Sequence, residues 1–167
     1  MGEFKKSRNF REYAVWRDAV DYATFVYEAT SKMPWLTSLT FLTRLDKVQT
    51  SLTLCSLLQK FEKKGLSDQL QRAVISISSN IAEGAARPTD ADFAHFLDIA
   101  LGSAFEVETQ LLIAKNIGYI KNANANDNLN DNDNLNDNKG VTYEELLSKL
   151  QDIERQLNGL INTIRNS

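Results

Sequence analysis

Residues 66–87, LSDQLQRAVISISSNIAEGAAR, decide the fold class, because they separate polar from apolar side chains at the spacing of an α-helix. At steps of three, four, four and three, one stripe carries Gln69, Arg72, Ser76, Asn80 and Glu83. The opposite stripe is apolar and carries Leu70, Ala73, Ile77 and Ile81. The pattern predicts an amphipathic helix over 66–84. Its polar side combines amides, a hydroxyl and both charges, more than solvation requires, and this favours a recognition or assembly surface over an active site.

Two further segments with helical spacing flank this helix. Residues 10–32 repeat apolar side chains mostly at steps of three and four, and Pro34 ends the pattern. Thr89 is a suitable N-cap for a helix that we expect to run for about 28 residues to Ile117. Gly118 suits the C-cap of that helix, because glycine adopts left-handed backbone conformations at low cost.

A last helix is predicted from Thr142, which together with Glu145 matches a capping box. Its apolar residues are Leu146, Leu150, Ile153, Leu157, Leu160 and Ile164. Four amphipathic helices joined by connectors predict an all-α protein, a helical bundle. At 167 residues, we expect residues 1–167 to form a single domain.

Two segments fall outside this plan. Residues 36–60 are rich in Leu and Thr, with a threefold leucine spacing that drifts around a helix, so helix and strand both remain open; we interpret this segment as an insertion between the first two helices. Residues 122–138 alternate Asn with other residues and repeat a hexad. Because Asn and Asp disfavour helix interiors, we predict a flexible, low-complexity loop before the last helix.

Composition limits the classes of function. No apolar run approaches the roughly 20 residues of a membrane span, and we expect a cytoplasmic protein with no membrane association. Cys55 is the only cysteine, which excludes an intrachain disulfide. Residues 1–90 carry 13 Lys and Arg against 10 Asp and Glu, whereas residues 91–167 carry 6 against 12. No basic patch is obvious, although Lys5, Lys6, Arg8 and Arg11 form a short arm that we expect to be a solvated tail.

Catalytic chemistry finds little support in the residues. His95 is the only histidine, so a catalytic triad or a multi-histidine metal site would depend on it alone. Carboxylate bundle sites for two metals use Glu-x-x-His motifs, and the chain contains none. We therefore expect no enzyme activity, no metal and no cofactor.

Arg72 has two competing interpretations. In the first, its guanidinium forms a bidentate ion pair with the carboxylate of Glu106 on the third helix, and this pair fixes the register of the bundle. In the second, Arg72, Asn80 and Arg87 face a partner, with phosphate as one candidate group, and Gln69 and Ser76 lie beside them. Both interpretations stay open from the sequence.

With the two inserted segments set aside, the chain resembles the four-helix bundle proteins first associated with intervening sequences of bacterial 23S ribosomal RNA genes. The resemblance rests on three motifs fixed across two helices: Gln-Leu-x-Arg-Ala from Gln69, Ser-x-x-x-Asn-Ile-Ala-Glu-Gly from Ser76, and Gly-Ser-x-x-Glu from Gly102. The family has a short turn in place of residues 36–60. We therefore predict an assembly or partner surface formed by Gln69, Arg72, Ser76, Asn80, Glu83, Arg87, Ser103 and Glu106.

The resemblance implies an antiparallel up-and-down four-helix bundle that assembles as a homopentamer and has no enzymatic activity. A distant relative of that family is the basic accessory protein of diversity-generating retroelements, which binds a reverse transcriptase and nucleic acid. We therefore expect a non-catalytic, self-associating adaptor or scaffold, with RNA or an RNA-associated protein as its partner. The alternative is a nucleic-acid-binding accessory of a reverse transcriptase.

Overall fold

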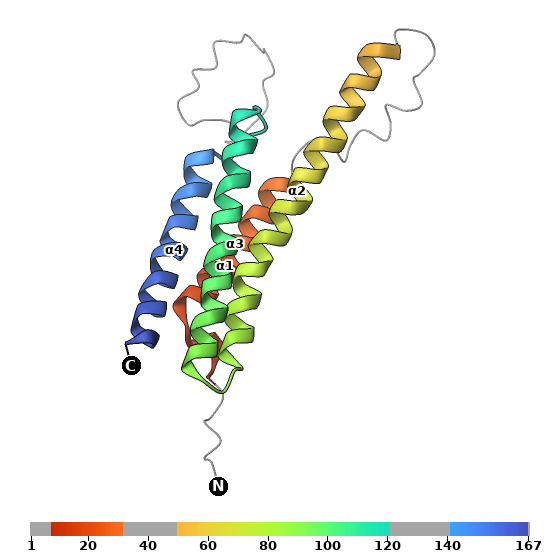
Figure 1. Ribbon diagram of the computed structural model, residues 1–167. Helices are drawn as coiled ribbons and strands as arrows, with labels where there is room; N and C mark the ends of the chain where they lie inside the picture. Colours follow the sequence, from red (N-terminus) through yellow and green to blue (C-terminus); the bar gives the residue numbers. More distant parts are fainter. Residues whose placement is uncertain (1–7, 32–49, 121–140, 167) are drawn as a thin grey trace.

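The computed structural model describes residues 8–31, 50–120 and 141–166, which form four α-helices (Figure 1). They are α1 (Ala14–Ser31), α2 (Thr50–Ala85), α3 (Asp90–Asn116) and α4 (Tyr143–Arg165), with a short 3₁₀-helix η1 (Phe10–Glu12) before α1. The helices lie side by side in alternating directions. The predicted all-α, up-and-down four-helix bundle is confirmed.

Each helix packs on two others, so the bundle closes around one core: α2 contacts α3, α3 contacts α4, and α1 contacts both α2 and α4. The apolar stripe predicted on α2 lines this core, and Ile77 and Ile81 are fully buried. The largest fully buried side chains from the other helices include Val26, Phe93, Leu97, Leu111, Leu150 and Leu157. Burial of these apolar faces is the main term that holds the helices together.

The predicted helix ends of α3 and α4 are confirmed. The side chain of Thr89 accepts a hydrogen bond from the backbone of Asp92 at 3.0 Å, and that of Thr142 accepts one from Glu145 at 3.3 Å. Each bond satisfies one of the backbone N–H groups that the first turn of a helix leaves without a partner. Gly118 follows α3 with a φ of +77°, a conformation that glycine adopts without strain.

Two helix boundaries differ from the prediction. α1 begins at Ala14, because the chain before it forms the 3₁₀ turn of η1. α2 begins at Thr50 and not near residue 66, so residues 50–60 of the predicted insertion continue the helix. At 1.5 Å per residue, its 36 residues span about 54 Å, and its first turns project past the other helices (Figure 1). The remainder of that insertion and the Asn/Asp-rich segment 122–138 lie outside the described residues.

The turn between α2 and α3 depends on a close contact at Gly84. A Cβ atom added to Gly84 would lie 2.6 Å from Cβ of Phe96 and 2.9 Å from Cδ2 of Phe93. Only a residue without a side chain lets the end of α2 approach the start of α3 this closely. Gly84, in the last turn of α2, therefore serves the packing at this end of the bundle.

Candidate assembly and partner surface

Five of the eight residues of the predicted surface lie on α2 (Gln69, Arg72, Ser76, Asn80 and Glu83), two lie on α3 (Ser103 and Glu106), and Arg87 lies in the turn between them. They fall into three groups. At one end of the stripe, Gln69, Arg72, Ser76 and Glu106 line a surface hollow of about 490 Å³ with Ala73. In the middle, Ser76, Asn80 and Ser103 form a hydrogen-bond network. At the other end, Glu83 and Arg87 form an ion pair. The three groups differ in which polar side chains are already bonded to other described residues and which are available to a partner.

The hollow carries two opposite charges that do not pair with each other. Among the described residues, Arg72 forms no ion pair or hydrogen bond, although it is exposed beside Glu106. The carboxylate of Glu106 instead accepts a hydrogen bond from Nε2 of Gln110 at 2.9 Å. The intrachain Arg72–Glu106 pair is therefore not formed in the described part of the chain, and the guanidinium remains available to a partner.

The middle group connects α2 to α3. The hydroxyl oxygens of Ser76 and Ser103 lie 3.0 Å apart, and Nδ2 of Asn80 donates to Oγ of Ser76 at 3.0 Å and to its backbone oxygen at 2.8 Å. Ser103 also donates to the backbone oxygen of Ile99. Half-buried polar groups that satisfy one another in this way fix the register of two helices. Ser76, Asn80 and Ser103 therefore serve the bundle, with Ser76 also reaching the hollow.

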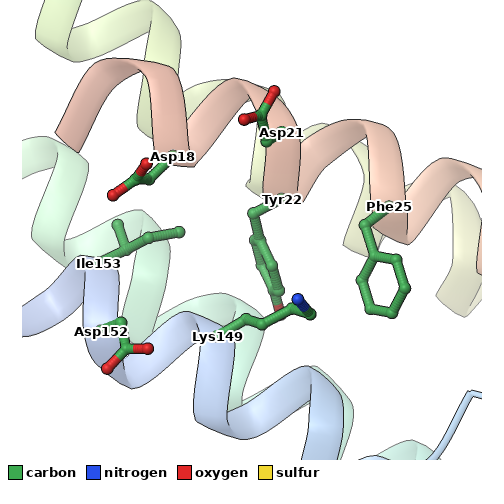
Figure 2. A pocket seen from close by; sticks show the side chains of 7 residues that line it. All are labelled: Asp18, Asp21, Tyr22, Phe25, Lys149, Asp152 and Ile153. Atoms are coloured by element: carbon green, nitrogen blue, oxygen red, sulfur yellow. The ribbon is translucent and has the colours of Figure 1, made fainter. Parts of the chain in front are cut away.

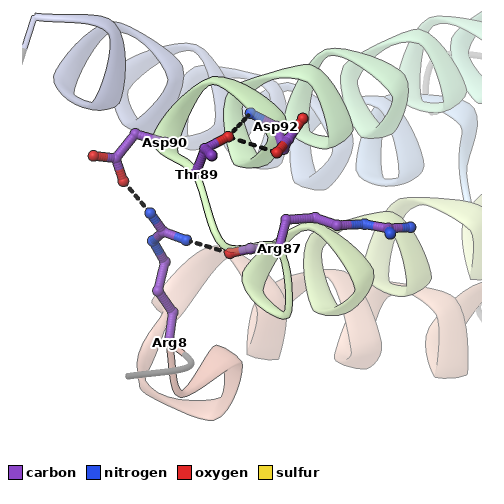
Figure 3. A network of polar contacts seen from close by, with 5 residues as sticks. All are labelled: Arg8, Arg87, Thr89, Asp90 and Asp92. Carbon is purple, nitrogen blue, oxygen red and sulfur yellow. Dashed lines mark hydrogen bonds and ion pairs between the residues drawn. The ribbon is translucent and has the colours of Figure 1, made fainter. Parts of the chain in front are cut away.

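The last group belongs to the turn between α2 and α3 (Figure 3). Arg8 forms an ion pair with Asp90 and donates from Nη1 to the backbone oxygen of Arg87 at 2.9 Å. Its guanidinium also lies 5.0 Å from the centroid of the Phe93 ring. The expectation of a solvated basic tail is wrong for Arg8, because these contacts hold it against the turn. Arg87 lies over Phe96 and pairs with Glu83, so its charge is already engaged.

The outer side of α3 carries an apolar face that was not predicted from the sequence, and we call it the α3 face. Its members are Ile99, Phe105, Leu112, Ile113 and Ile117, with exposed fractions of 39% to 52%. Only Tyr27 on α1 and Ile75 on α2 are comparable among the other described large apolar residues. α3 carries apolar side chains on its inner and outer sides, and a helix of that kind is normally covered on both. The spacing of its exposed isoleucines and leucine could have indicated this face.

A second hollow, of about 250 Å³, lies between α1 and α4 on the other side of the bundle (Figure 2). Its lining residues are Asp18, Asp21, Tyr22, Phe25, Lys149, Asp152 and Ile153. The charges are largely engaged: Asp18 accepts from Gln156 at 2.7 Å, Asp152 pairs with Arg155, and Lys149 lies 5.1 Å from the centroid of the Phe25 ring. The hollow is therefore a solvated groove between α1 and α4.

Two titratable groups between the packed helices, Tyr22 on α1 and Glu154 on α4, have raised pKa values. Burial raises the pKa of the Tyr22 hydroxyl above its usual range, with an added contribution from the charge of Glu154. Burial also raises the pKa of Glu154, and the like charge of Glu108 on α3 raises it further. Neither the Tyr22 hydroxyl nor Oε1 of Glu154 has a hydrogen-bond partner among the described residues. These groups lie among the packed helices and belong to the interior of the bundle.

The remaining observations concern metal binding, the single histidine and membrane spans. In the described ranges, no three or more His, Cys, Asp or Glu side chains are grouped to hold a metal ion. His95 is exposed, with its ring centroid 5.9 Å from that of Phe96. None of the described helices combines the length and the apolar character needed to cross a membrane.

Comparison with known proteins gives one family. The model of the 23S rRNA-intervening sequence proteins matches residues 43–139, more than half of the chain. The match contains all of α2 and all of α3, the two helices that carry most of the predicted surface. No curated protein matches the sequence.

Proposed function

The chain belongs to the 23S rRNA-intervening sequence protein family, and we propose that it acts as a non-catalytic, self-associating bundle in the cytoplasm, an adaptor or scaffold linked to RNA. The observation that carries this proposal is the outer surface of α2 and α3. There Arg72, which forms no ion pair within the described ranges, adjoins exposed apolar side chains on a helix that is apolar on both sides. Exposed apolar patches of this kind mark interaction sites more often than solvated surface.

A non-catalytic role agrees with the chemistry of the stripe. Its two serines bond to each other and to backbone oxygens, and His95 lies on the surface away from them. No nucleophile is paired with a base among the described residues, whereas such a pair is the basic unit of covalent catalysis. The ordered polar groups instead stabilise the junction of α2 and α3, which then presents a fixed surface.

We propose that the protein is linked to RNA through a protein partner and not through direct contacts with phosphate. In the described part of the chain, five cations form ion pairs with carboxylates: Arg8, Arg87, Lys115, Arg155 and Arg165. A phosphate would have to displace these carboxylates, and binding through phosphates needs several free cations. The adaptor proposal therefore has the protein bind its RNA-containing partner through protein contacts. A ring of identical bundles, five by the family resemblance, would strengthen weak contacts by avidity.

Light scattering coupled to size exclusion tests this function, with and without a structured RNA, at low and at physiological salt. We expect a mass of several chains, near five, that RNA does not change at physiological salt. A complex with RNA that weakens steeply as salt rises would favour the alternative, a nucleic-acid-binding accessory of a reverse transcriptase. A mass of one chain at all concentrations would overturn self-association.

A further inference from the structure

We propose that copies of this chain contact one another through the α3 face and the adjoining side of α2, and that Arg72 of one copy pairs with Glu106 of the next. The inference rests on the proposed self-association and adds to it a surface and a charge pair. Three features of the described residues support it: the area of the α3 face, the small residues within it, and the two charges of the hollow.

The area of the α3 face suits a contact between subunits. Five large side chains that are each about half exposed present roughly 400 Å² of apolar surface, about half of the ~800 Å² that each partner buries in a stable complex. From Ile99 to Ile117 the face extends over about 27 Å of helix. The polar hollow beside it supplies the rim that surrounds the apolar centre of an interface.

Small neutral residues within the α3 face permit close approach. Gly102 is exposed on α3 between Ile99 and Phe105, and a Cβ atom added there would meet no heavy atom within 4 Å. Thr109 is also exposed, and its hydroxyl donates to the backbone oxygen of Phe105, so it needs no outside partner. A bulky side chain of a second copy can therefore pack over Gly102 without a clash.

The charges favour a second copy as the occupant. One exposed cation and one exposed anion, Arg72 and Glu106, line the same hollow, and neither forms an ion pair with another of the residues that the structure describes. A second copy brings the matching anion and cation, and complementary charges of this kind fix the register of an interface. A nucleic acid would meet a carboxylate beside the single guanidinium, which offsets the attraction to phosphate.

The test uses charge reversal in the full chain, with mass measured by light scattering over a range of concentrations. Arg72→Glu and Glu106→Arg should each raise the dissociation constant about tenfold or more, because each places like charges opposite one another in the contact. The double variant Arg72→Glu/Glu106→Arg restores opposite charges at every contact of a ring and should assemble as the wild type does. Arg155→Glu, on α4 with its side chain 76% exposed, is the matched control and should assemble as the wild type does.

A second pair of variants tests the apolar part of the contact. Phe105→Ser and Leu112→Ser should shift the protein toward monomer, with helix content by circular dichroism unchanged. A wild-type monomer would overturn the proposed function together with this inference. If the wild type assembles and the α3-face variants assemble equally well, the inference alone is overturned. If the double charge variant stays monomeric, the Arg72–Glu106 pairing is overturned.

Discussion

Helices α3 and α4 lie side by side, and each buries a row of large apolar side chains in the same core. The fully or almost fully buried residues are Phe93, Leu97, Val107 and Leu111 on α3 and Leu150, Ile153 and Leu157 on α4. Their outer sides differ. α3 exposes five large apolar residues, whereas the outer side of α4, which the structure describes completely, carries none at comparable exposure.

The seam between the two helices shows that this difference does not come from their packing on each other. Ion pairs join them near both ends, Asp98 to Arg165 and Glu144 to Lys115, the second with an N–O distance of 3.7 Å. On the inner side, α3 and α4 both bury large apolar side chains in the core. The outer side of α4 is typical of a helix that meets water, and the outer side of α3 is typical of one that meets another protein.

The comparison predicts equal and large effects on the inner sides. Leu97→Ala and Leu150→Ala should each lower the free energy of unfolding by about 2–5 kcal/mol, because both remove a fully buried side chain and leave a cavity. Urea unfolding at low protein concentration measures this loss. Leu112→Ala, on the α3 face, is the control and should cost far less in the dissociated chain. A cost for Leu97→Ala that matches the control would contradict the common core.

Gly84→Ala should have the next largest effect, on the junction that positions α3. The added methyl group would lie within 3 Å of the side chains of Phe93 and Phe96, and Cβ of Phe96 is close to the backbone and has little freedom to move. Overpacking of this kind costs about 1–3 kcal/mol and outweighs the gain of up to about 1 kcal/mol from better helix propensity. Thermal unfolding would show a lower midpoint. A higher midpoint would mean that α2 and α3 separate at this turn without cost.

Much of this fold was predictable from the sequence because its signals are local. The caps at Thr89 and Thr142 and the buried stripe of α2 each depend on residues within a few positions of one another. The start of α2 was missed because the threefold leucine spacing and the β-branched threonines of residues 50–60 weaken the helical signal. The contacts of Arg8 were missed because they join residues about 80 positions apart in the sequence.

The candidate surface was only partly predictable. Helical spacing placed Gln69, Arg72 and Ser76 on one side of α2, and they line one hollow with Glu106. The spacing could not say which polar groups satisfy one another, and five of the eight residues bond among themselves: Ser76, Asn80 and Ser103 in one network, and Glu83 with Arg87. The α3 face was missed because apolar residues on two sides of one helix obscure each other's periodicity.

Substitution of the exposed glycines on the outer sides of α3 and α4 should have smaller effects that differ between the two helices. Gly102 on α3 and Gly159 on α4 are both exposed, and a Cβ atom at either would meet nothing within 4 Å. Alanine at either position should stabilise the dissociated chain by about 0.5–1 kcal/mol. If copies meet at the α3 face, Gly102→Leu should weaken assembly, whereas Gly159→Leu should not. Sedimentation of the two leucine variants at matched concentrations makes this comparison, and equal behaviour would remove Gly102 from the contact.

The smallest expected effect lies at the seam of α3 and α4 and concerns Glu154. Because burial and then the charge of Glu108 raise the pKa of its carboxyl, the folded state favours the protonated form more than the unfolded state does. The stability that this group contributes is therefore complete below its unfolded pKa and is lost as the pH rises through its folded pKa.

Glu154→Gln removes that loss, because the amide has nearly the same shape and no charge. The variant should be more stable than the wild type at pH 7, and the difference should shrink as the pH is lowered toward 4. Urea unfolding across this range measures it. In a Glu108→Gln background the pH dependence should be smaller, since the like charge is gone and only the effect of burial remains. A gain in stability that is the same at every pH would place its cause in packing and not in the charge of the seam.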